Sequence, residues 1–365
     1  MRHPSTGALA VLAPLFACLA GAPALRGTPP PRSPTPWPRQ LLGEAAGLSP
    51  LETAKVEQGD VVVRLLHATT GHEIAVSGAV RVASSKEAYL ELAGDVPRLK
   101  RGPAVLQLGV FGTLPGDEDV SGLNLDETEL AALRRCESGD CSSKLTALDP
   151  DAFRRFDWSA PGAKVRAEAL VQAGLAAHVR DYVTRGNAAM MRFDRTRFPT
   201  SLAAEFHGVL DASSHATDVA PELATFLEQY AGQPLPGSTE VWYWARETFG
   251  LKPVLSAYHV VVYRPPALPD LGLVVSKQFY ASRYFDVSLE ITIVADDPTP
   301  GGRPRCYLVY VARSRVDSLR GMLGGLKRGA VERESRDATV ARLARLRTQL
   351  DRLAGTSRSS APGSD

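Results

Sequence analysis

The chain contains none of the short motifs that mark the common enzyme chemistries. It has no Gly-x-Ser-x-Gly nucleophile elbow, no His-Glu-x-x-His helix, no phosphate-binding loop ending in Lys-Ser or Lys-Thr, and no dinucleotide fingerprint. Each absence removes one class of active site that a sequence can reveal by itself. The sequence therefore assigns no catalytic residue, no metal ligand and no cofactor.

Excess charge and long apolar runs are also missing. The formal net charge is +2, from 42 basic and 40 acidic residues, and the aromatic residues are not interleaved with basic clusters. Nucleic acid is therefore not an expected partner. No apolar run reaches the length of about twenty residues that spans a bilayer, so no transmembrane segment is expected. With 365 residues, of which 44% are hydrophobic, the chain can bury a substantial core.

The amino terminus has the pattern of an export signal. Arg2 precedes the apolar run from Ala8 to Leu19, and alanines at A-x-A spacing follow, which predicts cleavage after Ala22 or Ala24. We therefore interpret residues 1–24 as a signal peptide and expect a periplasmic or secreted protein.

The apolar run also contains a candidate lipid-attachment site. Leu15 to Cys18 resembles a bacterial lipobox, in which Cys18 would be acylated and would anchor the protein in the bacterial envelope. Phe16 occupies a position where such boxes usually have a small or aliphatic residue. The other interpretation is that Cys18 belongs to the discarded signal.

Composition divides the remaining chain. Residues 25–50 include a segment rich in Pro, Ser and Arg, which predicts an extended linker. We expect one folded domain over residues 51–354 and a disordered tail over residues 355–365.

Only four cysteines occur in the chain. Cys136 and Cys141 enclose Glu-Ser-Gly-Asp, which can turn tightly enough to bring the two sulfurs together, and export would expose them to oxidising conditions. We therefore predict a disulfide. A metal site at this pair would need two more ligands, which no second cysteine pair or nearby histidine supplies. Cys306 lies in a strand pattern and is predicted to be a buried free thiol.

The carboxyl-terminal part predicts a sheet followed by a helix. Four strand-like runs lie between Pro253 and Val316, and the run from Arg283 to Ala295 alternates apolar and polar residues with a period of two. The segment from Ser318 to Ala354 then has an apolar stripe, although glycines weaken its first turns and favour a firm start near Ala330. These patterns predict an α+β fold in which a long C-terminal helix covers a curved antiparallel sheet.

The segment before this sheet contributes further strands and a helical insert. Asp60 to Leu66 and Ile74 to Val82 are predicted strands, and Lys86 to Gly94 is a predicted helix with serine caps. Residues 112–237 form the predicted insert, in which Ala163 to Arg185 has the clearest helical stripe.

This order of elements resembles that of the START-like group of helix-grip proteins, which includes lipid-transfer and polyketide cyclase-like domains. Val82 to Glu87, continuing to Gly94-Asp95-Val96-Pro97, resembles the first strand and first helix of that group. The meander from Leu255 to Ser314 and the following helix resemble its end. The resemblance covers about half the chain and implies the fold and not an activity. The pocket is expected because a curved sheet covered by one helix leaves space for a small apolar molecule. The insert departs from the family plan.

Polar residues inside the meander are the candidate binding groups. Lys277 interrupts an apolar run, and Arg313 and Arg315 alternate at the end of the last strand. We predict that these cations anchor an anionic head group between the meander and the helix after Ala330, while aromatic residues such as Trp244 and Tyr280 line the pocket. The alternative is cross-strand ion pairing with acidic neighbours, namely Asp286, Glu290 or Asp317. If Arg313 is a rim charge, its replacement by alanine should change stability by only about 0 to 1 kcal/mol.

His67, His72 and Glu73 are the nearest approach to a metal cluster, but their spacing is more typical of a strand, turn and strand at the surface. The predicted function is therefore an exported binding or carrier protein for a lipid-like or other apolar small molecule. Two alternatives stay open, a cyclase- or hydrolase-type enzyme that uses the same pocket, and an envelope interaction protein without a small ligand.

Overall fold

The computed structural model describes residues 38–136, 143–193, 199–248, 252–298, 304–321 and 324–356. All of them belong to one compact unit, Pro36–Asp365. The predicted signal peptide, Cys18, most of the predicted linker, Cys141 and nearly all of the predicted tail lie outside the described residues.

A single open sheet of eight strands forms the centre of this unit, in the order β1-β2-β10-β9-β8-β7-β6-β3. Every neighbouring pair is antiparallel. The strands are β1 Val62–Leu65, β2 Glu73–Val82, β3 Val105–Val110, β6 Ser238–Glu247, β7 Val254–Tyr263, β8 Leu271–Ala281, β9 Phe285–Asp296 and β10 Cys306–Val316. A separate pair, β4 Arg192–Phe193 and β5 Thr200–Ser201, forms a two-stranded sheet.

Helices precede, interrupt and follow the strands. The α-helices are α1 Arg39–Glu44, α2 Pro50–Glu57, α3 Lys86–Gly94, α4 Val96–Leu99, α5 Glu127–Arg134, α6 Pro150–Arg154, α7 Ala163–Arg185, α8 Leu202–Asp211, α9 Ser214–Thr217, α10 Pro221–Glu228 and α11 Gly324–Thr356. Short 3₁₀ turns are η1 Asp117–Val120, η2 Lys144–Leu148, η3 Gly186–Ala189 and η4 Asp317–Leu319.

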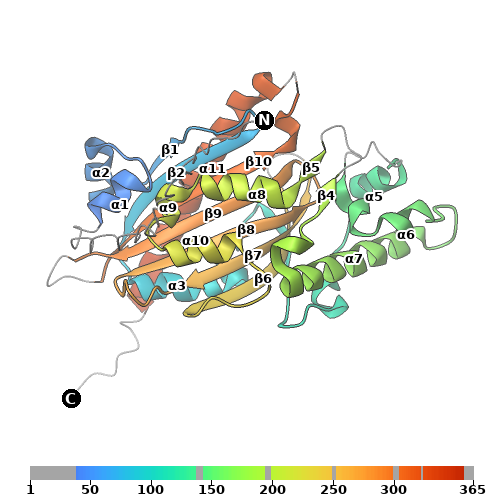
Figure 1. Ribbon diagram of the computed structural model, residues 1–365, viewed down its shortest axis with the longest axis horizontal. Helices are drawn as coiled ribbons and strands as arrows, with labels where there is room; N and C mark the ends of the chain where they lie inside the picture. Colours follow the sequence, from blue (N-terminus) through green and yellow to red (C-terminus); the bar gives the residue numbers. More distant parts are fainter. Residues whose placement is uncertain are drawn as a thin grey trace, which may run out of the picture. The chain divides into compact units, whose positions relative to one another are not determined.

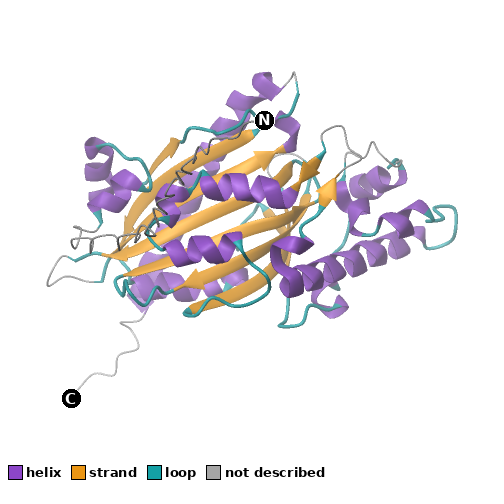
Figure 2. Cartoon of the chain, in the orientation of Figure 1, coloured by secondary structure: helices purple, strands orange, loops and turns teal. Residues whose placement is uncertain are grey.

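Helices cover both faces of the sheet, which gives three layers (Figures 1 and 2). One face, here called the α11 face, packs against α3, α4 and α11. The other, here called the insert face, packs against α7, α8 and α10 of the segment between β3 and β6, and against α1 and α2. The expected α+β fold, with a large antiparallel sheet and a long C-terminal helix, is confirmed.

The period of two in β9 explains how one strand serves two cores. Leu289, Ile291 and Ile293 are buried in the core on the insert face, whereas Glu290 points to the α11 face and contacts a side chain of α11. Successive side chains of a strand point to opposite faces, so these two environments alternate along the chain.

Close approach on the α11 face depends on two glycines. A Cβ atom at Gly78 of β2 would lie 2.9 Å from Leu343 Cδ1 of α11, and one at Gly272 of β8 would lie 2.7 Å from Leu90 Cδ1 of α3. A side chain at Gly272 would require Leu90 to change its position, and one at Gly78 would also meet the backbone carbonyl oxygen of Val62 at 2.9 Å.

Two expected boundaries are wrong. Residues 39–44 form α1 instead of an extended linker, and Leu41 and Leu42 are buried in the main core. The closing helix begins at Gly324 and not near Ala330, because Arg328 donates hydrogen bonds to the carbonyl oxygens of Gly71 and Glu73 at 3.0 and 2.9 Å and so holds the first turns in place. None of the described helices is long and apolar enough to cross a membrane.

Candidate functional site

The structure places the five predicted binding residues on the insert face, opposite to α11. Lys277 points to the same face of β8 as Val275 and Phe279, which belong to the core on the insert face. Arg313 and Arg315 point to the same face of β10 as Val311. Trp244 and Tyr280 belong to that core as well. The expected placement of these side chains under the C-terminal helix is therefore wrong.

Polar atoms of four of these five residues instead bind the helical insert. Lys277 Nζ donates a hydrogen bond to Asn187 Oδ1 in η3. Trp244 Nε1 donates to the carbonyl oxygen of Asp119 at 2.8 Å, and the Tyr280 hydroxyl donates to the carbonyl oxygen of Lys144 at 3.2 Å. Arg315 Nε lies 3.6 Å from Glu205 Oε2 in α8. These contacts attach the insert to the sheet.

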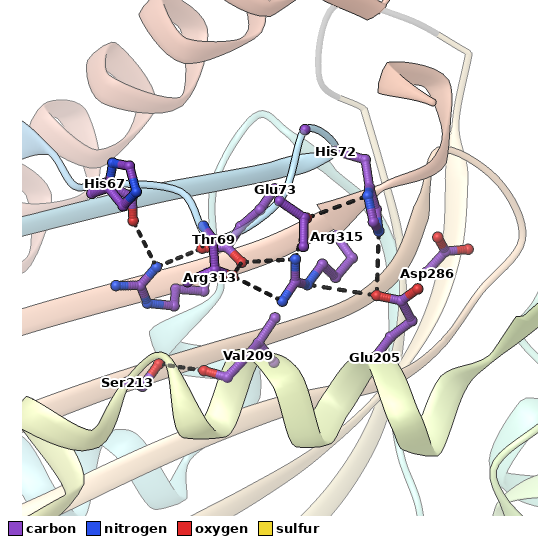
Figure 3. A network of polar contacts seen from close by, with 12 residues as sticks. His67, Thr69, His72, Glu73, Glu205, Val209, Ser213, Asp286, Arg313 and Arg315 are labelled. Atoms are coloured by element: carbon purple, nitrogen blue, oxygen red, sulfur yellow. Dashed lines mark hydrogen bonds and ion pairs between the residues drawn. The ribbon is translucent and has the colours of Figure 1, made fainter. Parts of the chain in front are cut away.

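Arg313 and Arg315 form a buried ion-pair cluster with Glu73 of β2 (Figure 3). The Glu73 side chain is 0% exposed, and its two oxygens lie 2.5 Å from Arg313 NH1 and 3.0 Å from Arg315 NH1. Thr69 Oγ1 donates a further hydrogen bond to Glu73 at 2.7 Å. Ion pairing is the alternative that the sequence left open, but the acidic partner is Glu73 and not one of the acidic residues expected there.

The cluster continues to a group that could in principle ligate a metal. Single atoms of His72, Glu205 and Asp286 lie within 4.8 Å of one another. Arg320 NH2 already contacts both carboxylates, at 2.6 Å from Glu205 and 2.8 Å from Asp286, and Lys144 Nζ lies 2.9 Å from Asp286. Cationic side chains thus occupy the positions where a metal ion would neutralise these acids.

Electrostatics at Glu205 agree with this arrangement. Burial alone would raise the pKa of Glu205, but hydrogen bonds from His72 and Arg320 outweigh that effect and lower the pKa to about 2. The carboxylate stays ionised and bonded to its neighbours.

A second set of polar side chains lies between the sheet and the helices of the α11 face. We call it the α11-face cluster. It combines four tyrosines with paired charges and an amide: Tyr89 of α3, Lys100 after α4, Tyr243 and Glu247 of β6, Tyr258 of β7, Gln278 of β8, Glu290 of β9, Tyr310 of β10 and Arg342 of α11.

One half of the α11-face cluster is centred on Tyr258. Its hydroxyl donates to Glu247 Oε2 at 2.8 Å, and Lys100 Nζ lies 3.7 Å from the other oxygen of Glu247. The ammonium also lies 5.1 Å from the centroid of the Tyr258 ring. Burial would lower the pKa of Lys100, but Glu247 more than offsets this and raises it, so the amine stays charged.

The other half joins the sheet to α11. Arg342 NH1 lies 2.5 Å from Glu290 Oε2 and 3.1 Å from the Tyr310 hydroxyl, and the guanidinium lies 4.8 Å from the centroid of the Tyr310 ring. The side chains of Arg342 and Glu290 are 26% and 22% exposed. This half of the cluster is therefore reachable from solvent.

Two enclosed polar atoms of the cluster have no hydrogen-bond partner among the described residues. They are the Tyr243 hydroxyl and Gln278 Oε1, from side chains that are 0% and 3% exposed. Both flank Tyr258, because the Tyr243 ring stacks on the Tyr258 ring at 4.7 Å and Gln278 Nε2 lies 3.3 Å from the Tyr258 hydroxyl. Burial raises the pKa of Tyr243 to about 12, so its hydroxyl remains a neutral donor at ordinary pH.

Sequence reasoning missed these residues by one position. Gln278 is next to Lys277 in β8, and Tyr243 is next to Trp244 in β6. The available signal was the alternation of side chains along β6 and β8, because the neighbour of each predicted residue points to the opposite face of the sheet.

The cysteine predictions have different outcomes. Cys306 is a buried free thiol, as expected, and burial raises its pKa to about 12, which keeps it protonated. The pairing of Cys136 with Cys141 stays a prediction, because Cys141 lies outside the described residues.

Comparison of the chain with protein-family models, curated proteins and solved structures gives no match.

Proposed function

We propose that the protein binds a small amphipathic molecule at the α11-face cluster and acts as a carrier or binding protein for it. The observation that carries the proposal is that Tyr243 and Gln278, each with an enclosed neutral atom that has no partner among the described residues, flank the same Tyr258 side chain in a cluster that solvent reaches. Other such atoms lie elsewhere, for example on His178 and Arg313. An enclosed polar atom without a partner costs about 1–3 kcal/mol, and such atoms are rare in folded proteins. A ligand group that bonds both atoms would remove this cost.

The chain order supports the same location. Strand β2, the short helices α3 and α4, strand β3, the strands β6 to β10 and the terminal helix α11 follow one another, and β2 pairs with β10. This is the order that a helix-grip relationship implies, with β1 added at the edge and the insert placed between β3 and β6. In such a plan, the ligand lies between the sheet and the terminal helix.

The cations of the α11-face cluster already have acidic partners, which favours a neutral polar group on the ligand. Lys100 pairs with Glu247 and Arg342 pairs with Glu290, so an added carboxylate would have to compete with an existing partner. Tyr243 offers a donor and Gln278 an acceptor. A neutral group that accepts and donates, such as a hydroxyl or an amide, satisfies both.

Access to this group requires movement of side chains. Tyr243 and Gln278 are enclosed, whereas Lys100 and Arg342 are 17% and 26% exposed. We expect the two cationic side chains to swing aside when a ligand enters, while Val260 and Val274 contact its apolar part.

Two neighbouring tyrosines provide a matched test. Tyr243→Phe removes a hydroxyl that makes no hydrogen bond of ordinary length among the described residues and interacts only weakly with the nearby Lys100 ammonium, so the free energy of unfolding should change little. Tyr258→Phe removes the donor to Glu247 and should lower stability by about 1–3 kcal/mol. Thermal and denaturant unfolding measure both.

The binding measurement uses oleyl alcohol, oleamide, oleate and a hydrocarbon of equal length, with native mass spectrometry of the freshly purified protein to detect a retained molecule. The alcohol or the amide should bind better than oleate, and Tyr243→Phe should weaken that binding about tenfold. An empty protein that binds no member of the series, or equal binding by wild type and Tyr243→Phe, would contradict the proposal. Chemical conversion of a probe would show that the protein is an enzyme and not a carrier.

We also propose that the protein works in the periplasm or outside the cell, on the strength of the Arg2-led apolar run and the alanines that follow it. The intact mass of the exported protein tests this, since removal of residues 1–24 predicts one mass and acylated Cys18 another. An exported chain that retains its first twenty residues would contradict both versions.

A further inference from the structure

A surface hollow of about 790 Å³ lies near the carboxyl-terminal end of α11. The end of α2, the end of β2, the start of β10 and the last third of α11 form its walls. Its charged lining consists of four arginines and two acids: Arg81, Arg305, Arg347, Arg352, Glu57 and Asp351. We call it the arginine hollow.

The acids of the arginine hollow already have other partners. Arg39 contacts both oxygens of Glu57, at 2.5 and 3.0 Å, and Asp351 Oδ1 accepts a hydrogen bond from the backbone N–H of Ala83 at 2.9 Å. Asp297, outside the lining, pairs with Arg81 in the same way that Arg39 pairs with Glu57. The surplus of positive charge along the wall therefore comes from Arg305, Arg347 and Arg352 against Asp351.

Two of the arginines are fixed in position. Arg81 NH1 donates to the carbonyl oxygen of Glu57 at 3.0 Å, and its guanidinium lies 5.5 Å from the centroid of the Tyr307 ring. Arg347 NH1 donates to the carbonyl oxygen of Gly59 at 2.6 Å. Each guanidinium has five N–H donors, so these bonds leave others available.

Arg305 completes the wall from the start of β10. It is exposed, and within the described part of the chain its side chain makes no hydrogen bond or ion pair. Convergence of like charges from three elements is unfavourable in the empty hollow and becomes favourable when an anion enters.

We propose that the arginine hollow binds a phosphate-type oxyanion. Guanidinium groups match the oxygens of phosphate in charge and in hydrogen-bond geometry, and fixed guanidinium groups lose little freedom when they bind. The volume exceeds that of one phosphate group, so a phosphorylated small molecule and a phospholipid head group both fit the chemistry. This site is separate from the α11-face cluster, and its test does not depend on the ligand bound there.

The experiment measures inorganic phosphate and pyrophosphate by calorimetry, and vesicles of phosphatidylglycerol against vesicles of phosphatidylcholine by co-sedimentation, all at a fixed salt concentration. Binding of the free anions identifies a soluble phosphate ligand. Selective binding of the phosphatidylglycerol vesicles, without binding of the free anions, identifies a lipid head group. Either result supports the oxyanion site. If neither the free anions nor the phosphatidylglycerol vesicles bind, the proposal is wrong.

Matched variants locate the binding. Arg305→Gln should weaken the binding detected in either measurement about tenfold, because it removes one charged donor from the wall of the hollow. Arg336→Gln is the control, since this exposed arginine of α11 lies outside the hollow and pairs with Asp337 at 3.6 Å. Equal weakening by both variants would show general attraction to positive charge and would overturn the site. Unchanged unfolding curves for both variants exclude a loss of folding as the cause.

Discussion

The two faces of the sheet use polar side chains in different ways. On the insert face, Lys277, Glu73 and Arg315 are almost fully buried and bind partners in the insert or in neighbouring strands. On the α11 face, Glu290 and Arg342 pair at the edge of solvent, and two enclosed atoms of the same layer have no hydrogen-bond partner among the described residues. The insert face has such atoms too, on His178 and on the Nε atoms of Arg313 and Arg315, but both guanidinium groups are bonded to Glu73 through other nitrogens. The faces therefore differ in the kind of group: ion-paired charges attach elements to one another on the insert face, whereas the neutral unpartnered atoms of the α11 face share a cluster with a pair that solvent reaches.

The largest expected difference between the faces concerns their ion pairs. Arg313→Ala leaves Glu73, with 0% exposure, without one of its two arginines and should lower the free energy of unfolding by about 3–5 kcal/mol. Arg342→Ala breaks a partly exposed pair and should cost only about 1 kcal/mol. Chemical denaturation of the two variants measures the difference directly.

This expectation replaces the rim charge that the sequence suggested for Arg313. Arg336→Ala, an exposed arginine on α11, serves as the reference with almost no effect. If Arg313→Ala proves as mild as this reference, the buried cluster around Glu73 is not what attaches β10 to β2 in solution.

The sequence predicted the sheet and the terminal helix because both have a clear hydrophobic period, but it could not supply the phase of the polar residues. All ten residues of β7 are buried, since helices cover both of its faces. In such strands a polar residue in either phase points into a core. Which face receives a ligand depends on where the insert packs, and its contacts are too distant in sequence to appear as a local pattern.

The amino-terminal boundary failed for a related reason. Two buried leucines, Leu41 and Leu42, are enough to dock α1 on the main core, but so short an apolar segment beside a proline-rich stretch has no detectable period. The Glu73 cluster was equally hidden, because its members come from β2 and β10, which are 240 residues apart.

A smaller effect, dependent on pH, is expected from His178 of α7. Burial lowers its pKa from 6.5 to about 4, and its Nε2 atom has no partner among the described residues. The unfolded chain therefore binds a proton that the folded protein does not, so stability falls as the pH falls from about 6.5 to 4. Between pH 7 and pH 5 the loss should be about 2 kcal/mol.

His178→Phe tests this by removing the titrating group while keeping an aromatic ring beside Phe279 and Tyr280. Denaturation at pH 7 and pH 5 should show a smaller loss in the variant than in the wild type. The chosen range lies above the region where Glu205, with a pKa of about 2, begins to titrate. Identical losses in the two proteins would mean that His178 is hydrated in solution.

The smallest effect should be a gain in stability. Lys277 is 1% exposed, its Nζ lies 3.7 Å from the centroid of the Phe206 ring and 5.1 Å from that of Tyr182, and among the described residues its polar contact is the amide oxygen of Asn187 and not a carboxylate. Burial lowers its pKa well below 10.5, which the partial compensation from Glu228 does not restore. Lys277→Met should therefore raise stability by about 1 kcal/mol at pH 7, because the thioether packs against the same rings without desolvating an amine.

The dependence of this gain on pH separates it from a change in packing. With a folded pKa below 10.5, the unfolded chain binds the proton more tightly, so wild-type stability rises with pH and levels off above 10.5. The advantage of Lys277→Met should consequently shrink between pH 7 and pH 10. Lys164→Met, at a lysine that is 52% exposed, should give no such trend. A loss of stability in Lys277→Met would instead show that the ammonium is charged and held by the rings and by Asn187, and that the insert face depends on it for attachment.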